Sequence, residues 1–164
     1  MEQELCTKPE ILLIGLSVRT NNKDEFIPAK CKIGELVEQY STQNIADQIP
    51  NRKNPGVTLV AYSEYANKER GDFTYLIGEE VTSFDNMPST LQKLIIAPSS
   101  YQKFTTAPGK VPNVVIDAWE EIWKMAADEL GGDRAFVADF EVYDQRAADL
   151  DHTALDIYIG IIAD

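Results

Sequence analysis

Apolar and polar positions along the first half of the chain follow the patterns of strands around one helix. An apolar run over residues 10–20 predicts a first strand, which polar residues then break. Apolar side chains at helical spacing, with Pro28 near the first turn, predict a helix that ends before Pro50. Residues 57–65 and 73–81 predict two further strands joined by a turn, which gives the order strand-helix-strand-strand.

The second half repeats this order. The segments that we expect there are a connector over residues 87–98, a strand over 99–106, a helix over 112–130, and strands over 136–144 and 154–162. Gly131 and Gly132 end the helix, because glycine readily adopts the left-handed conformation of a helix C-terminus. The chain therefore contains a pseudo-repeat, whose period is too long for a solenoid.

The two predicted hairpins also resemble each other in sequence. Residues 62–65 are similar to residues 140–143, and residues 73–78 are similar to residues 155–160. An acid and a tyrosine recur in the first pair of segments, and a glycine ends both members of the second pair. This similarity indicates a duplicated pair of strands.

The expected fold class is α+β, in a single domain over residues 1–164 with pseudo-repeat halves at about residues 10–82 and 99–162. Each half would form an antiparallel sheet with one helix on a face. Two such units side by side would leave a central cleft along their pseudo-two-fold axis. Ligand sites favour seams of this kind.

The strand near the C-terminus combines acidic and aromatic residues. Side chains alternate along a strand, so Asp139, Glu141 and Tyr143 share one face, and Phe140 and Val142 share the other. A carboxylate beside aromatic rings in a core-forming strand is costly unless a cation or hydrogen-bond donors meet it. This strand is therefore the first candidate for a binding site.

Composition and charge narrow the class of ligand. The apolar fraction of 44% and the aromatic fraction of 9% favour a folded domain over a disordered one. The formal net charge of −12 repels phosphate backbones, so we expect no direct binding of nucleic acid. It attracts cations instead, although the charge could equally serve only to keep the protein in solution.

Cysteine and histidine suggest no metal or cofactor. Cys6 and Cys31 lack the spacing of a zinc site or a disulfide scaffold. The one histidine, His152, lies in a predicted turn among acids, where a solvated residue is the ordinary interpretation. No basic segment leads into an apolar run at the N-terminus, and no apolar run reaches membrane-spanning length. We expect a cytoplasmic protein without a membrane partner.

Six short motifs in a fixed order carry a family resemblance. They are residues 62–65, 71–78, 104–106, 118–123, 139–144 and 156–159. Together they resemble the GyrI-like small-molecule-binding domain, also called the effector-binding domain of AraC-type activators. The resemblance extends over about residues 11–162 and implies two strand-helix-strand-strand units around a central cleft.

The resemblance also implies a ligand class and a central residue. In drug-sensing members, a glutamate on the penultimate strand neutralises cationic amphipathic ligands among aromatic residues, and Glu141 matches that position. Members that regulate transcription usually carry a DNA-binding helix-turn-helix domain, for which this sequence has only about ten residues before its first predicted strand. The chain therefore resembles stand-alone members, among them cationic-drug-binding modules of integron cassettes. A homo-oligomer and a separate DNA-binding partner remain open alternatives.

Aromatic residues supply the remaining site candidates. Tyr143 and Tyr75 flank the proposed seam, and Trp119 lies on the second helix in the matching motif. Phe104 and Tyr158 are further candidates for the cleft wall. Ordinary core packing is the alternative for each of these aromatic residues. Glu64 is a candidate for the pseudo-symmetric counterpart of Glu141, although an alignment of the two repeats on their tyrosines matches Glu64 with Val142.

Three functions are compatible with these residues. The first is non-catalytic binding of cationic, hydrophobic small molecules, as in multidrug recognition, with a role as sensor for a transcription partner. The second is hydrolysis of ester-containing or other toxic natural products, with Glu141 as general base towards water. The third is a protein interaction like the gyrase inhibition of some relatives. No activated nucleophile is evident, so we expect a binding protein rather than an enzyme.

Overall fold

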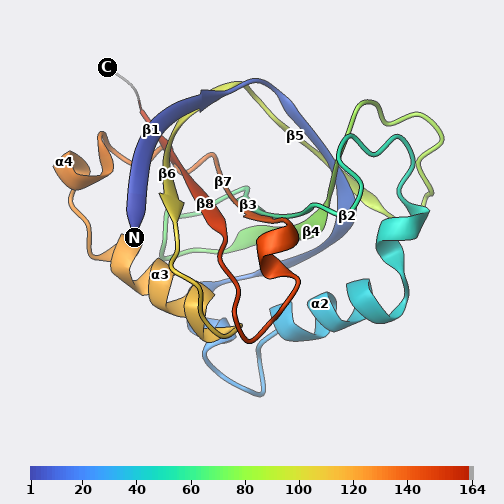
Figure 1. The fold of residues 1–164 in the computed structure, drawn as a ribbon, viewed down its shortest axis with the longest axis horizontal. Helices are drawn as coiled ribbons and strands as arrows, with labels where there is room; N and C mark the ends of the chain where they lie inside the picture. The colour runs from blue at the N-terminus through green and yellow to red at the C-terminus, as the bar shows by residue number, and fades with distance from the viewer. Residues whose placement is uncertain (163–164) are drawn as a thin grey trace.

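The computed structural model describes residues 1–162 and confirms the α+β fold class. Its strands form one eight-stranded antiparallel sheet with the order β1-β6-β8-β7-β3-β4-β2-β5. The strands are β1 (Glu2–Lys8), β2 (Ile11–Thr20), β3 (Thr58–Ser63), β4 (Phe73–Val81), β5 (Gln92–Ile96), β6 (Ser99–Thr105), β7 (Ala138–Tyr143) and β8 (Asp156–Ile161). The sheet is strongly curved (Figure 1).

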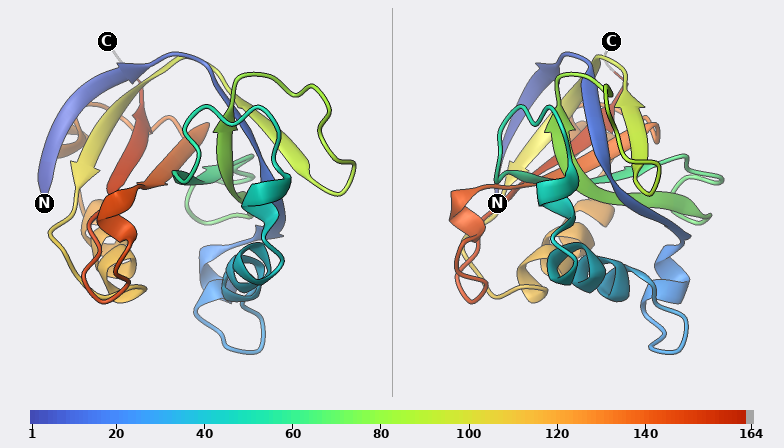
Figure 2. Two further views of the ribbon diagram at one scale, coloured as in Figure 1. Left: turned by 45° about the vertical axis from the view of Figure 1, so that its right-hand side comes forward. Right: turned by 90° about the vertical axis from the view of Figure 1, so that its right-hand side faces the viewer.

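Two helices lie on the same side of the sheet, apart from each other (Figure 2). The helical segments are α1 (Asn22–Glu25), α2 (Ile33–Thr42), α3 (Asn113–Trp123), α4 (Ala127–Leu130) and the 3₁₀ turns η1 (Ile45–Gln48) and η2 (Gln145–Ala147). The predicted helix over residues 112–130 is interrupted, because Ala126 is extended and its N–H bonds to the Glu129 carboxylate at 3.2 Å. Likewise, α2 begins at Ile33, so Pro28 precedes the helix. No helix within residues 1–162 has the length and apolar character needed to cross a bilayer.

The two strands at the edges of the sheet, β1 and β5, were not predicted from the sequence. Most side chains of β1 are exposed, so it lacks the alternation that marks a half-buried strand. The strand β5 occupies part of the predicted connector and is only five residues long. Each edge strand pairs with the half of the chain to which it is not adjacent in sequence, since β1 pairs with β6 and β5 pairs with β2.

The predicted halves meet through a direct pairing of β3 with β7, which makes one continuous sheet out of the two expected ones. In this register Val60 lies opposite Glu141, and Tyr62 lies opposite Asp139. Because paired residues share a face, the acids of β7 point to the same side as the tyrosine of β3. The pairing therefore places residues from both halves at one site.

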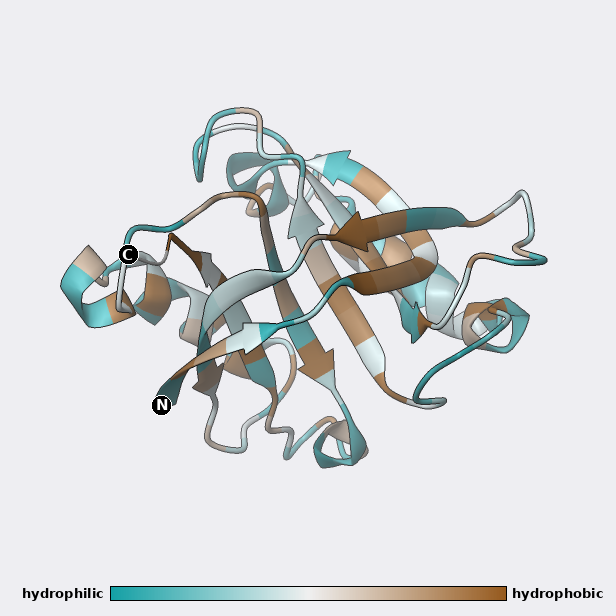
Figure 3. Cartoon of the chain, turned by 90° about the horizontal axis from the view of Figure 1, so that it is seen from above, coloured by the Kyte–Doolittle hydropathy of each residue, from teal (hydrophilic) through white to brown (hydrophobic). Residues whose placement is uncertain are grey.

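Apolar residues recur along the strands and form a core on both faces of the sheet (Figure 3). One cluster lies under α2 and includes Tyr40 and Ile77, and another lies under α3 and includes Phe104 and Ile122. A third cluster, which includes Phe140, fills the opposite face. The helices cover only parts of their face, and the uncovered region between them forms the site described next.

Candidate functional site

A cavity of about 1110 Å³ opens on the helix-bearing face of the sheet, and both α2 and α3 contribute to its walls. Strands β3, β4 and β7 form its floor. Its inner wall is aromatic and consists of Tyr62, Tyr65, Phe73, Tyr75, Trp119 and Tyr143. Tyr62 contacts both Tyr75 and Trp119 edge to face, with ring centroids 5.4 and 5.1 Å apart. These contacts fix the rings that a ligand would meet.

Glu141 lies on the cavity floor and is 1% exposed. One carboxylate oxygen, Oε2, accepts hydrogen bonds from the Tyr62 hydroxyl and the Trp119 indole N–H, each at 2.7 Å. The other oxygen, Oε1, accepts a hydrogen bond from the Tyr143 hydroxyl at 2.6 Å. These three donors are neutral, and no ion pair within residues 1–162 includes Glu141. The carboxylate is therefore solvated by the protein but not neutralised by it.

Burial raises the pKa of Glu141, and the hydrogen bonds from Tyr143, Trp119 and Tyr62 oppose this rise. The pKa values of Tyr62 and Tyr143 are raised well above the ordinary value, first by burial and then by the charge of Glu141. Both hydroxyls therefore stay protonated and continue to donate. A cation in the cavity would favour the ionised form of Glu141.

The neighbouring acid on the same face of β7 is already neutralised. Asp139 is fully buried and pairs with the Arg134 guanidinium at 2.7 Å. It also accepts hydrogen bonds from the Tyr65 hydroxyl and, at 2.8 Å, from the backbone N–H of Gly160. Of these two acids on β7, only Glu141 lacks a cationic partner within the protein, so only Glu141 is available to pair with a cation in the cavity.

The structure brings four of the predicted site residues together. Glu141, Tyr143, Tyr75 and Trp119 all line the cavity. That they contact a ligand stays a prediction. Trp123, four residues after Trp119, also lines the cavity and is 40% exposed.

Phe104 and Tyr158 are not among the residues that line the cavity, which corrects their predicted place in the cleft wall. Phe104 shares the sheet face of Glu141 but is fully buried in the cluster under α3. Tyr158 points to the opposite face, where it stacks on Phe140 with a centroid distance of 4.5 Å. The alternation of side chains along β8 explains this, because Ile157 takes the position opposite Glu141.

Tyr62, Tyr65 and Phe73 also belong to the cavity wall and were not predicted from the sequence. The register of β3 against β7 and β4 places Tyr62 between Asp139 and Tyr75, and this pairing was not predicted. The tyrosines of residues 62–65 were a usable signal, since they repeat the aromatic positions of residues 140–143. Glu64, the other acid considered, lies outside the cavity lining and accepts a hydrogen bond from Thr74 at 2.9 Å.

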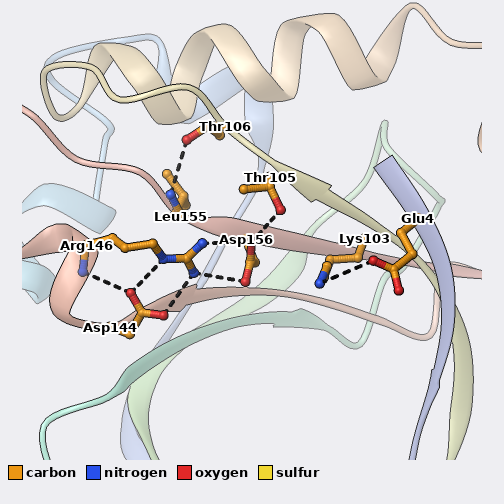
Figure 4. Close-up of polar contacts among 8 residues, drawn as sticks. All are labelled: Glu4, Lys103, Thr105, Thr106, Asp144, Arg146, Leu155 and Asp156. Atoms are coloured by element: carbon orange, nitrogen blue, oxygen red, sulfur yellow. Dashed lines mark hydrogen bonds and ion pairs between the residues drawn. The ribbon is translucent and has the colours of Figure 1, made fainter. Parts of the chain in front are cut away.

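The loop that follows β7 lines one side of the cavity. An ion-pair network holds this loop (Figure 4). Arg146 bonds to Asp144 at 2.8 Å and to Asp156 at 2.9 Å, and Asp156 accepts a hydrogen bond from Thr105 at 2.7 Å. The network ties the end of β7 to β6 and β8. The network therefore holds in place the loop that contains Leu150, which lines the cavity.

Comparison with known proteins agrees with this architecture. Residues 4–161 match the model of a family described as Cass2, integron-associated effector binding protein. A Bacillus subtilis (strain 168) protein, YobU, whose name proposes a transcriptional regulator, is 29% identical over 147 residues, which are 90% of this chain and 89% of YobU.

Two solved structures share the fold. An integron cassette protein from the mobile metagenome of Vibrio cholerae has a TM-score of 0.76 at 25% identity, covering 98% of this chain and 95% of that protein. The structure of SAV2435 bound to tetraphenylphosphonium has a TM-score of 0.75 at 19% identity, covering 99% of this chain and 94% of that protein. The names of the family and of YobU indicate effector binding or regulation rather than catalysis. With nearly its whole length matched by the family model, the chain belongs to the integron-associated effector-binding proteins.

Proposed function

We propose that this chain binds cationic, hydrophobic small molecules in its aromatic cavity without transforming them. The observation that carries the proposal is the state of Glu141, a buried carboxylate with three neutral donors and no internal cation. A ligand cation would supply the missing positive charge. The apolar body of the same ligand would replace water against the aromatic wall.

The chemistry of the site suits ligands of varied shape. At a separation of about 5 Å and an effective dielectric constant of about 20, a cation would gain about 3 kcal/mol from Glu141. The rings of Trp119, Tyr62 and Tyr75 add cation–π contacts of roughly 0.5–2 kcal/mol each. Neither attraction demands a directional hydrogen bond from the ligand. The cavity therefore recognises charge and hydrophobicity more than a particular outline.

A relative of the same fold supports this ligand class. SAV2435 was solved with tetraphenylphosphonium, a cation surrounded by aryl groups. The name of YobU supports a link to transcription, in which this chain would act as a sensor. The net charge of −12 on this chain favours a separate partner for any contact with DNA.

Binding can be measured directly, because both tryptophans of the chain line the cavity. We expect tetraphenylphosphonium to quench their fluorescence and triphenylphosphine oxide, a neutral aryl analogue, to bind more weakly. Glu141→Gln should weaken binding of the cation by roughly 100-fold and leave the neutral analogue nearly unchanged, since about 3 kcal/mol of attraction is lost.

Glu79→Gln is the matched control. Glu79 is another carboxylate of the sheet that is 1% exposed, but it pairs with Arg52 and does not line the cavity. Equal affinity for the cation and the neutral analogue, or equal losses in the two variants, would contradict the proposed function. Turnover of an ester panel that disappears in Glu141→Gln would favour the hydrolase instead.

A further inference from the structure

The cavity has a buried acidic end and an apolar outer rim. The apolar rim consists of Phe26, Val37, Ile116, Trp123 and Leu150, which are between 37% and 62% exposed. All of them line the same cavity as Glu141. Large apolar side chains gathered at one opening, rather than scattered singly, indicate a surface that binds something apolar.

The rim is assembled from four separate parts of the chain. Val37 lies on α2, Ile116 and Trp123 lie on α3, and the other two members lie on loops. On α3, Ile116 and Trp123 are spaced three residues before and four residues after Trp119, so they continue its cavity-facing stripe outward. One apolar path therefore leads from Trp119, whose indole N–H donates to Glu141, to the outside of the cavity.

We propose that the ligand is a single-chain cationic amphiphile. Its head group would lie at Glu141, and its alkyl tail would leave the cavity between α2 and α3 and lie across the apolar rim. This inference rests on the proposed function and adds the shape of the ligand to it. The continuity of the rim with the cavity makes the tail of the same ligand the favoured occupant.

The size of the cavity agrees with a long ligand. Drug-sized sites occupy about 300–1,000 Å³, and the volume of about 1110 Å³ here exceeds the upper end of that range. An alkyl tail that covers the rim removes apolar surface of both the ligand and the protein from water. Each buried methylene should then strengthen binding by up to about fourfold.

Gly34 provides a position at which the path can be narrowed. It lies in the first turn of α2 and lines the cavity. Apart from the adjoining residues and the helix backbone, a Cβ atom added there would meet nothing within 4 Å, so this position has open space for a side chain. Phenylalanine at this position should obstruct the tail.

The test compares butyl-, octyl- and dodecyltrimethylammonium below their micelle concentrations by isothermal titration calorimetry. For the wild type, we expect the affinity to rise steeply with chain length. The double variant Val37→Gln/Ile116→Gln should lower the affinity for the dodecyl compound by roughly 10- to 50-fold, which equals the loss of two or three buried methylenes. The affinity for the butyl compound should fall far less. Gly34→Phe should show the same selectivity for length.

The matched control is Ile95→Gln/Val137→Gln, which replaces two exposed apolar side chains that do not line the cavity. It should leave the whole series unchanged. If cations bind without any dependence on chain length, the tail inference fails and the proposed function stands. If neither the alkyl series nor tetraphenylphosphonium binds, both fail.

A second copy of the chain is the competing occupant of the rim. Sedimentation velocity distinguishes the two, with the double rim variant compared with the wild type in the absence of ligand. A wild-type dimer that the rim substitutions dissociate, together with unchanged affinity for the dodecyl compound, would overturn the inference. A wild type and a variant of equal size, with selective loss of the dodecyl compound, would support it.

Discussion

Arg134 is the residue whose removal should reveal how the site separates its two acids. Its guanidinium neutralises the fully buried Asp139 at 2.7 Å and packs over the Phe136 ring, 4.2 Å from the centroid. Arg134→Met keeps the apolar stem of the side chain and removes the charge. The substitution would leave the Asp139 carboxylate buried without a cation.

The expected cost follows from the remaining contacts. Breaking a buried ion pair by removing one partner costs about 3–5 kcal/mol. Asp139 retains the donors of Tyr65 and Gly160, and the Arg134 side chain is 12% exposed, so the lower end of that range applies. We therefore expect the free energy of unfolding to fall by about 3 kcal/mol, which lowers Tm by roughly 6–12 °C for a chain of this size.

Urea unfolding followed by circular dichroism measures this change. The double variant Arg134→Met/Asp139→Asn should recover about 2 kcal/mol of the loss, since the amide can still accept the Gly160 N–H. Arg146→Met is the matched control, because its pairs with Asp144 and Asp156 are more exposed and should cost about 1 kcal/mol or less. Equal losses in the two arginine variants, or a double variant no more stable than Arg134→Met, would refute the reasoning.

Further predictions concern the charge, the sheet and the corrected site residues. The ionised fraction of Glu141 grows as the pH rises, and burial raises its pKa, so this growth occurs at higher pH than for an ordinary glutamate. Calorimetric affinity for tetraphenylphosphonium should therefore increase from about pH 4 to about pH 8. A profile that is equally flat for Glu141→Gln and the wild type would contradict this. Gly15→Ala should lower the free energy of unfolding in urea by about 1–3 kcal/mol, because the added methyl group would overlap the Ile77 carbonyl oxygen. Unchanged stability would show that β2 and β4 can move apart to accommodate the methyl group. Tyr158→Phe should leave cation affinity within about twofold of the wild type, whereas Tyr62→Phe should reduce it roughly tenfold by removing a donor to the carboxylate. The same fluorescence titration measures both, and the opposite order would count against the face assignment.

Much of the fold follows from local pattern. The strand over residues 73–81 was predicted with its exact bounds, and α2, α3 and the other central strands were predicted near their places. The edge strands β1 and β5 were not, because their identity depends on a distant partner rather than on alternation in their own sequence. The interpretation of residues 10–82 and 99–162 as repeats stays a prediction.

The candidate site shows the same limit. Strand alternation alone placed Glu141 and Tyr143 on one face, opposite Phe140. Alternation within a strand does not determine which strands pair, so Tyr62 was not predicted. Tyr158 was a candidate for the cleft wall, but it stacks on Phe140 on the opposite face. The donors that meet Glu141 come from β3, α3 and β7, and only the tertiary fold brings these segments together.

The reciprocal placement of the edge strands has a consequence for how the chain folds. Glu2 pairs with Thr105 and Ile11 pairs with Ile96, so both edges of the sheet close only after most of the chain is available. Closing such long loops slows folding, and unpaired strands are open to pairing with other chains in the meantime. During synthesis, β1 and one edge of β2 should therefore lack their partner strands until β6 and β5 have emerged. The yield of folded protein should depend on how quickly residues up to Thr105 emerge.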